Sequence, residues 1–258
     1  MRWTSSRANQ WYKKHPWLVG CNYAPRTAIN QLEMWQAETF MPGVIDEELA
    51  WAADLGMNTV RVFLHDLLWF KDSKAFLSRF ELFLQIAERH GIGAMPVFFD
   101  SVWHPFPYLG KQRDPEPGVH NSGWVQSPGV AILKDEKQFN ALEDYVASFV
   151  EHFRDDPRIH IWDVWNEPDN INALSYGPRD IPDKKAEIVT RFLPRVFDWV
   201  RSAKPTQPLT SGVWLGEWTS PNTLKPWEKV QIEQSDVISF HCYGNKADVE
   251  LRVRQLQQ

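Results

Sequence analysis

Six short stretches of the chain are almost continuously apolar. They comprise residues 16–23, 57–65, 92–100, 158–167, 207–214 and 235–243. Runs of this length that lack regular polar alternation are typical of β-strands covered on both faces, as in a parallel sheet. We therefore predict six strands that belong to one sheet.

Helical patterns separate most of these strands. Apolar residues recur at three- and four-residue spacing in the stretches 46–56, 72–91, 135–157 and 183–205. The first two stretches end at Gly56 and Gly91, and glycine is common just after the last turn of a helix. This alternation of strands and helices predicts βα units around a parallel sheet.

The long connections follow the carboxyl ends of the predicted strands. They are residues 24–45, 101–134, 168–182 and 215–234, whereas the connections at the opposite end are short. This asymmetry favours an α/β fold of the TIM-type (β/α)8 barrel, whose functional site is built from the loops after the strands. An open doubly wound sheet alternates in the same way, but no glycine-rich phosphate turn follows the first strand.

The number of predicted strands is smaller than a closed barrel requires. A (β/α)8 barrel has eight strands, and this sequence supplies about six βα units. Either two strands lie hidden in the long loops or the chain lacks the last two units. The second interpretation is simpler, because the loops are rich in Pro, Trp, Asn and Gly. We expect residues 1–258 to form a single incomplete barrel domain, truncated at its C-terminus.

The charge balance excludes some classes of partner. The net charge is −5 and the pI is near 5.9, so we expect neither nucleic acid nor an anionic membrane as a partner. No apolar run reaches the roughly 18 residues of a membrane span, and the first residues resemble no signal peptide. Cys21 and Cys242 are too few for a disulfide framework. The cellular compartment stays open.

Tryptophan is unusually frequent, with 14 residues, several of them in predicted loops. Flat aromatic side chains stack well on the apolar faces of sugar rings, while the polar edges of a sugar need hydrogen-bond partners. We expect about half of the loop tryptophans to contact a carbohydrate and the rest to pack between loops and barrel. The candidates are Trp35, Trp69, Trp103, Trp124, Trp214 and Trp218.

The sequence WDVWNEP, residues 162–168, places a carboxylate at the end of the fourth predicted strand. Strict alternation along the strand would put Asp163, Trp165 and Glu167 on one face. A carboxyl group among tryptophans would be partly desolvated, which raises its pKa toward the range of a general acid. The alternative is a solvated glutamate where a strand stops.

The motif W-x-x-x-N-E-P at this position resembles the (β/α)8 retaining glycoside hydrolases, the clan that contains the family 5 cellulases, mannanases and related xylanases. The resemblance implies that Glu167 is the general acid/base and that Asn166 binds the 2-hydroxyl of the sugar. It also implies hydrolysis of a β-linked poly- or oligosaccharide, with a β-1,4 linkage expected first. The resemblance implies that this reaction needs no cofactor or metal.

Further short motifs match the same clan. Arg61 in NTVRVF corresponds to an arginine that helps to hold the nucleophile, and a buried arginine needs an anionic partner; the alternative is a salt bridge to a helix. His104 in SVWHP corresponds to a histidine that lines the site, or else it caps a backbone group. FHCYG resembles the clan's His-x-Tyr, which gives His241 and Tyr243.

The second carboxylate of the reaction is not visible. A retaining hydrolase needs two carboxyl groups about 5–5.5 Å apart, and in this clan the nucleophile is a glutamate that ends the seventh strand. Glu217, in GVWLGEW, has the best location for a substitute nucleophile. A hydrogen-bonding role at the rim of the cleft nevertheless fits this residue better. Asp100 suits a structural acceptor or a sugar ligand.

Two other functions remain open. Metal-dependent hydrolysis could use Asp66 or Asp100 with nearby histidines, but Asn22 and Tyr23 stand where a His-x-His pair is expected. The chain could also be an inactive barrel or a non-catalytic carbohydrate-binding protein. An open barrel exposes two strand edges, which favours a homodimer that covers them.

Overall fold

The computed structural model describes residues 1–172 and 184–257. Its sheet contains five parallel strands in the order β1-β2-β3-β4-β5. The strands are β1 (Gly20–Asn22), β2 (Thr59–Phe63), β3 (Gly93–Asp100), β4 (Trp162–Asn166) and β5 (Leu209–Thr210). Each lies within one of the first five predicted stretches.

The sixth predicted stretch continues the sheet beside β5 without forming a regular strand. Phe240 bridges Val213 in parallel orientation. The backbone amide of His241 donates to the carbonyl of Val213 at 2.9 Å, and the amide of Val213 donates to that of Ser239 at 3.1 Å. This pairing brings His241 to the same edge of the sheet as the end of β4.

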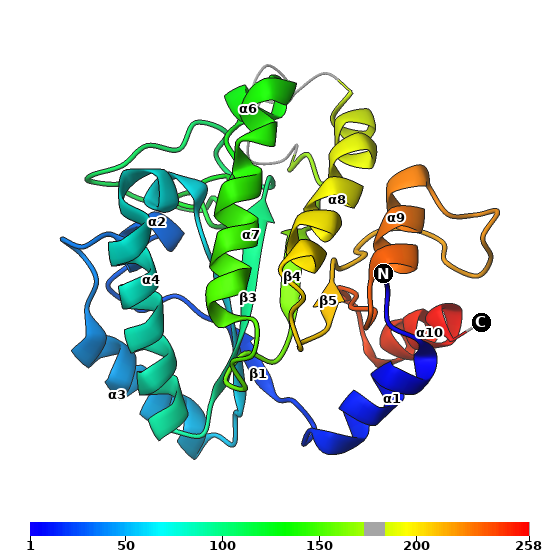
Figure 1. The fold of residues 1–258 in the computed structure, drawn as a ribbon, viewed down its shortest axis with the longest axis horizontal. Helices are drawn as coiled ribbons and strands as arrows, with labels where there is room; N and C mark the ends of the chain where they lie inside the picture. Colours follow the sequence, from blue (N-terminus) through cyan, green and yellow to red (C-terminus); the bar gives the residue numbers. More distant parts are fainter. Residues whose placement is uncertain (173–183, 258) are drawn as a thin grey trace.

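Ten helices are present in the described residues. They are α1 (Ser5–Lys14), α2 (Gln31–Trp35), α3 (Pro42–Asp54), α4 (Asp66–Arg89), α5 (Val130–Leu133), α6 (Glu136–Asn140), α7 (Leu142–Phe153), α8 (Lys185–Ser202), α9 (Pro226–Gln234) and α10 (Lys246–Leu256). Helices α3, α4, α7, α8 and α9 pack against their neighbours in that order and cover one side of the sheet (Figure 1). Sequential strand order with helices on one side is the winding of a (β/α) barrel.

The hydrophobic core lies between the sheet and these helices. It is rich in aromatic rings, with Phe98 of β3 stacked on Trp162 of β4 at 5.5 Å and both rings against Phe149 of α7. Phenylalanines along α4 and α7 interlock in the same layer. Large rings at helical spacing explain why the amphipathic patterns predicted these helices well.

Strict alternation of faces fails near the ends of β3 and β4. Phe98 and Phe99 are consecutive, yet both rings contact Tyr145 of α7. Trp165 likewise packs in the core against Phe99, whereas Asp163 and Asn166 both contact Arg61. The prediction that Asp163, Trp165 and Glu167 share one face is therefore wrong, because the strand ends depart from regular pleating.

Histidine rings close the amino-terminal end of the sheet. The ring of His160, just before β4, lies against Gly93 so closely that a Cβ on this glycine would come within 2.3 Å of it. Nδ1 of His160 is 3.1 Å from the hydroxyl of Thr59, and His15, at the end of α1, lies edge-on to its ring. Helix α1 thus sits below the strands (Figure 1).

No helix in residues 1–172 and 184–257 has the length and apolar character needed to cross a bilayer.

Candidate active site

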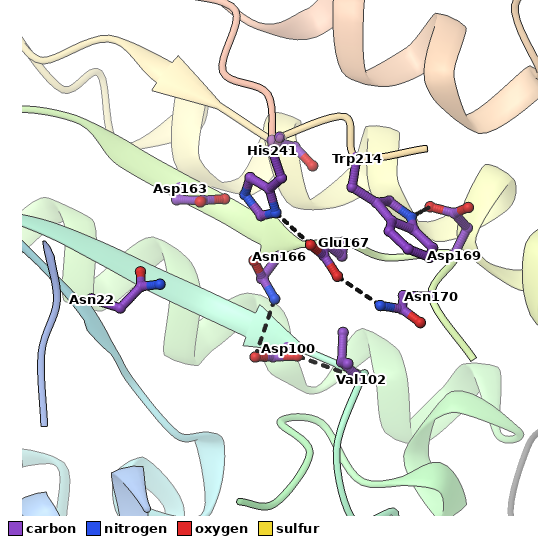
Figure 2. A network of polar contacts seen from close by, with 12 residues as sticks. Asn22, Asp100, Val102, Asp163, Asn166, Glu167, Asp169, Asn170, Trp214 and His241 are labelled. Atoms are coloured by element: carbon purple, nitrogen blue, oxygen red, sulfur yellow. Dashed lines mark hydrogen bonds and ion pairs between the residues drawn. The ribbon is translucent and has the colours of Figure 1, made fainter. Parts of the chain in front are cut away.

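Polar side chains from four segments meet at the carboxyl end of the sheet (Figure 2). Arg61 comes from β2, Asp100 from the end of β3, and Asn166 and Glu167 from the end of β4. His241 comes from the segment paired with β5. Parallel strands that end at one edge bring these distant residues together.

Glu167 is at the centre of this group and is 6% exposed. Its Oε1 lies 2.5 Å from Nδ1 of His241, and its Oε2 accepts a 2.7 Å hydrogen bond from the side-chain amide of Asn170 (Figure 2). Its backbone has φ of 38°, a left-handed conformation that side chains rarely adopt. The neighbouring contacts must hold this strained conformation in place.

The expectation of a raised pKa at Glu167 is wrong. Burial does raise the pKa, but the hydrogen bonds from His241 and Asn170, together with the nearby charges, outweigh it and lower the pKa below its ordinary value. Hydrogen bonds to the charged form favour that form. The structure thus stabilises Glu167 as a carboxylate.

Arg61 connects the group to the interior of the sheet. Its guanidinium donates to Asp163 at 2.6 Å, to the Oδ1 of Asn166 at 2.8 Å and to Asn22 of β1 at 3.1 Å. Arg61, whose side chain is 14% exposed, therefore has the expected anionic partner, and this partner is a strand residue, Asp163, rather than a helix residue.

Asp100 fixes the other end of the Asn166 amide. Its Oδ2 accepts from the Nδ2 of Asn166 at 3.3 Å and from the indole of Trp103 at 2.7 Å. Asn166 therefore accepts from Arg61 and donates to Asp100, which sets the orientation of its amide. Asp100 is 1% exposed, and burial raises its pKa to about 6.

The structure places His104 and Tyr243 differently from Glu167 and His241. His104 lies in the loop after β3, where its Nδ1 accepts from the backbone amide of Phe106 and lies 2.9 Å from the guanidinium of Arg113. Tyr243 is 89% exposed, and its hydroxyl forms no hydrogen bond within the described part of the chain. The roles implied for both residues stay predictions.

Trp35 lies in the core, so its prediction as a carbohydrate contact is wrong. It is completely buried beside Phe80 and Phe83, and its indole donates to the carbonyl of Phe63. Trp69 and Trp218 are also buried, at 8% and 3% exposure. A ligand cannot stack on rings that are covered by protein.

Trp103, Trp124 and Trp214 remain at the surface of the site, each half-buried. Trp103 and Trp124 pack against each other at 5.8 Å, and Trp124 meets Phe63 at the end of β2. Trp214 donates to Asp169 at 3.0 Å, two residues after Glu167 (Figure 2). These rings therefore flank the polar group on two sides.

Glu217 is turned toward the C-terminal helix. Its carboxylate accepts from Gln255 of α10 at 2.9 Å and from the backbone amide of Thr219. Among the residues that the structure describes, no hydrogen bond or ion pair joins it to Glu167 or His241. Its carboxylate is held by these contacts, and nothing in the described residues supports Glu217 as a substitute nucleophile.

Three residues that support the polar group around Glu167 were not identified as such from the sequence. Asn170 follows Glu167 in a polar stretch, Asp163 is part of the strand, and Lys185 lies at the start of a helix. The anionic partner expected for an arginine within an apolar strand could have pointed to Asp163. No group of three or more metal-ligating side chains occurs in the described residues.

No family model matches the sequence, and no curated protein matches it. Solved structures do match its fold. GH5_18 from Streptomyces cattleya, solved with GlcNAc, is 18% identical with a TM-score of 0.61, over 88% of this chain and 51% of that one. The β-mannanase of the blue mussel Mytilus edulis is 14% identical with a TM-score of 0.56, over 89% and 71%.

An exo-β-1,4-mannosidase from Opitutaceae bacterium strain TAV5 is 19% identical with a TM-score of 0.53, over 87% of this chain and 38% of that one. The fold is therefore that of the (β/α)-barrel glycoside hydrolases. More narrowly it is like that of GH5 proteins, as the motifs predicted. The chain spans about half the length of the GH5_18 protein.

Proposed function

We propose that this chain carries the acid/base part of a retaining β-glycoside hydrolase site and acts on a β-linked poly- or oligosaccharide. One observation carries the proposal. Glu167, at the end of the fourth strand, is held between His241 and Asn170 and follows Asn166, whose amide is oriented by Arg61 and Asp100. Similar folds occur in enzymes named as mannanase and mannosidase.

Each residue has a defined part in the proposed chemistry. Glu167 gives its proton to the glycosidic oxygen as the bond to the sugar breaks and a carboxylate nucleophile takes the sugar. It then removes a proton from the water that releases the sugar. The second N–H of the Asn166 amide is available for the 2-hydroxyl. The nucleophile is not assigned among the described residues.

The substrate class follows from the surroundings of the site. Half-buried Trp103, Trp124 and Trp214 offer apolar faces on which pyranose rings stack. A β-1,4-linked glycan is the proposed substrate, because the exo-β-1,4-mannosidase and a GH5_18 structure with Manβ1-4GlcNAc share the fold. The rates of cleavage of aryl β-mannosides, β-glucosides and β-xylosides are therefore to be compared to identify the preferred sugar.

The test compares the unaltered chain with Glu167→Gln on aryl β-glycosides. With a poor leaving group, loss of the acid is expected to lower kcat/KM by about 10²–10⁴-fold. With a dinitrophenyl leaving group, which needs no proton, cleavage is expected to be lowered much less. Glu217→Gln is the matched control and is expected to leave both rates unchanged. Equal rates for Glu167→Gln and the unaltered chain on the poor leaving group would contradict the assignment.

A second candidate function is carbohydrate binding without hydrolysis. Asp100 and Asp163, the carboxylates that contact Asn166 or Arg61, are each 1% exposed, so a sugar cannot reach them. Glu217 is bound to Gln255. Calorimetric titration with mannobiose and cellobiose decides between the two functions. Binding without turnover by the unaltered chain favours the binding protein.

A further inference from the structure

Lys185 is a buried lysine that the proposed chemistry does not use. It begins helix α8, is 4% exposed, and forms no ion pair with a carboxylate among the described residues. Burial lowers its pKa to about 8, although Asp100, Asp169 and Glu167 favour its charged form. A buried ammonium group is costly to desolvate, so its position requires compensating contacts.

The contacts of Lys185 are two backbone carbonyls. Its ammonium donates to the carbonyl of Ser101 at 2.6 Å and to that of Asn170. Ser101 follows β3 and Asn170 lies in the turn after β4. Lys185 therefore joins the ends of two strands to the start of a helix.

Both partners of Lys185 hold the backbone around Glu167. The hydroxyl of Ser101 accepts from the indole of Trp165 at 3.0 Å and donates to the carbonyl of Pro168 at 3.3 Å. The backbone amide of Asn170 donates to the carbonyl of Glu167 at 2.9 Å, and its side chain donates to Oε2 of Glu167. These contacts hold the backbone before and after Glu167.

The backbone of Glu167 needs such support. Its φ of 38° is unfavourable for a residue with a side chain and persists only where surrounding contacts determine it. The turn from Glu167 to Asn170 is closed by the amide of Asn170, and Lys185 holds the carbonyl of that same residue. Displacement of Asn170 would remove a donor from Glu167.

We propose that Lys185 is a positioning residue for Glu167, which ties the carbonyls of Ser101 and Asn170 together and thereby holds the amide of Asn170 against the catalytic carboxylate. The inference rests on the proposed function of Glu167. Its test reads the carboxylate directly, so that it does not depend on turnover.

The experiment follows Glu167 by carbon NMR during an acid titration of Lys185→Met. Loss of one hydrogen bond to the carboxylate and of the nearby cation is expected to weaken the acid dissociation of Glu167 about tenfold. Hydrogen exchange at the backbone amide of Asn170 is expected to accelerate by a similar factor. Lys184→Met is the matched control, because the neighbouring Lys184 is exposed and pairs with Glu187. Neither the acid dissociation of Glu167 nor the exchange rate at Asn170 is expected to change in Lys184→Met.

Three further variants separate positioning from general stability. Asn170→Ala is expected to reproduce most of the effect on Glu167, and addition of Lys185→Met to it is expected to change Glu167 less than Lys185→Met does alone. Lys185→Arg, which keeps the charge and donors, is expected to restore much of the normal titration. Lys185→Gln serves if Lys185→Met does not fold, with a shift in the same direction.

An unchanged titration of Glu167 in a folded Lys185→Met or Lys185→Gln variant overturns the proposal. A shift that is fully additive with Asn170→Ala also overturns it, because Lys185 then acts independently of Asn170. If the unaltered chain cleaves no glycoside, the proposed function fails, and the titration still decides the role of Lys185.

Discussion

The two oxygens of Glu167 have different partners, and both partners favour the ionised carboxylate. His241 contacts Oε1 and Asn170 donates to Oε2, and these contacts lower the pKa of Glu167 against the effect of burial. A general acid must hold a proton when the bond breaks. Hydrolysis of poor leaving groups is therefore expected to decline as the pH rises through this lowered pKa.

Replacement of His241 by alanine is expected to raise the pKa of Glu167, because burial then acts with less opposition. A higher pKa keeps the acid protonated to a higher pH. The falling, alkaline limb of the pH profile of kcat/KM is expected to move upward by about one pH unit, as loss of one charge-assisted hydrogen bond implies.

The measured quantity is the pH at which kcat/KM falls to half of its maximum on the alkaline side, and not the maximum itself. His152→Ala, at an exposed position on α7, is the control and is expected to leave the limb in place. A limb that moves to lower pH in His241→Ala would contradict the role assigned to this contact.

Polar residues within or at the end of the apolar runs could be predicted from the sequence, whereas the roles of Lys185 and Asn170 could not. Arg61, Asn166, Glu167 and His241 each stand in a short motif within or at the end of an apolar run, and the structure brings these four together. Lys184 and Lys185 are chemically identical neighbours, yet one is exposed and the other is 4% exposed. Only the fold distinguishes them.

Among the elements, the long helices rich in apolar residues were predicted, whereas the polar or very short ones were not. Helices α4, α7 and α8 present large rings to the core at helical spacing. Helix α1 has no buried residue, and α2 is a short helix within a long loop. Helix α1 is polar overall and α2 spans only five residues, so neither offers the long run of spaced apolar residues on which prediction depends. The departure from pleating in β3 and β4 is likewise set by packing.

Helix α2 delivers Trp35 to the core, where it is completely buried among the phenylalanines of α4. Replacement of Trp35 by alanine is expected to lower the free energy of unfolding by about 3–5 kcal/mol, because it leaves a large cavity and an unpaired carbonyl at Phe63. Urea denaturation followed by circular dichroism measures this change.

Trp51→Ala provides the matched comparison, since Trp51 on α3 is 53% exposed. A change within about 0.5 kcal/mol is expected there. If Trp35→Ala were as stable as the unaltered chain but had lost carbohydrate binding, Trp35 would belong to a ligand surface after all.

At the scale of the whole molecule, the sheet is open in the described residues. Strand β1 pairs with β2 on one side, and its three residues are all exposed. A free strand edge presents unpaired backbone groups to other chains. We propose that two copies associate through this edge, as the sequence led us to expect.

Sedimentation velocity over a range of concentrations, with a reducing agent present, tests the association. The unaltered chain is expected to sediment faster as its concentration rises. Cys21→Lys places a charge on the exposed strand and is expected to shift the population toward the monomer. Leu55→Lys adds the same charge at a 76% exposed position just after α3 and is expected to have no effect. A monomer at every concentration contradicts the proposal.

The histidine rings at the amino-terminal end of the sheet have a consequence for molecular traffic. His160 fills the space that Gly93 leaves open, and His15 lies beside it. The two rings therefore block the amino-terminal end of the open sheet beside β2, β3 and β4. On this side of the sheet, a ligand of Glu167 is therefore expected to approach and leave at the carboxyl ends of the strands. Changes in the loops that follow β3 and β4 are therefore expected to alter the association and the dissociation rate of such a ligand together.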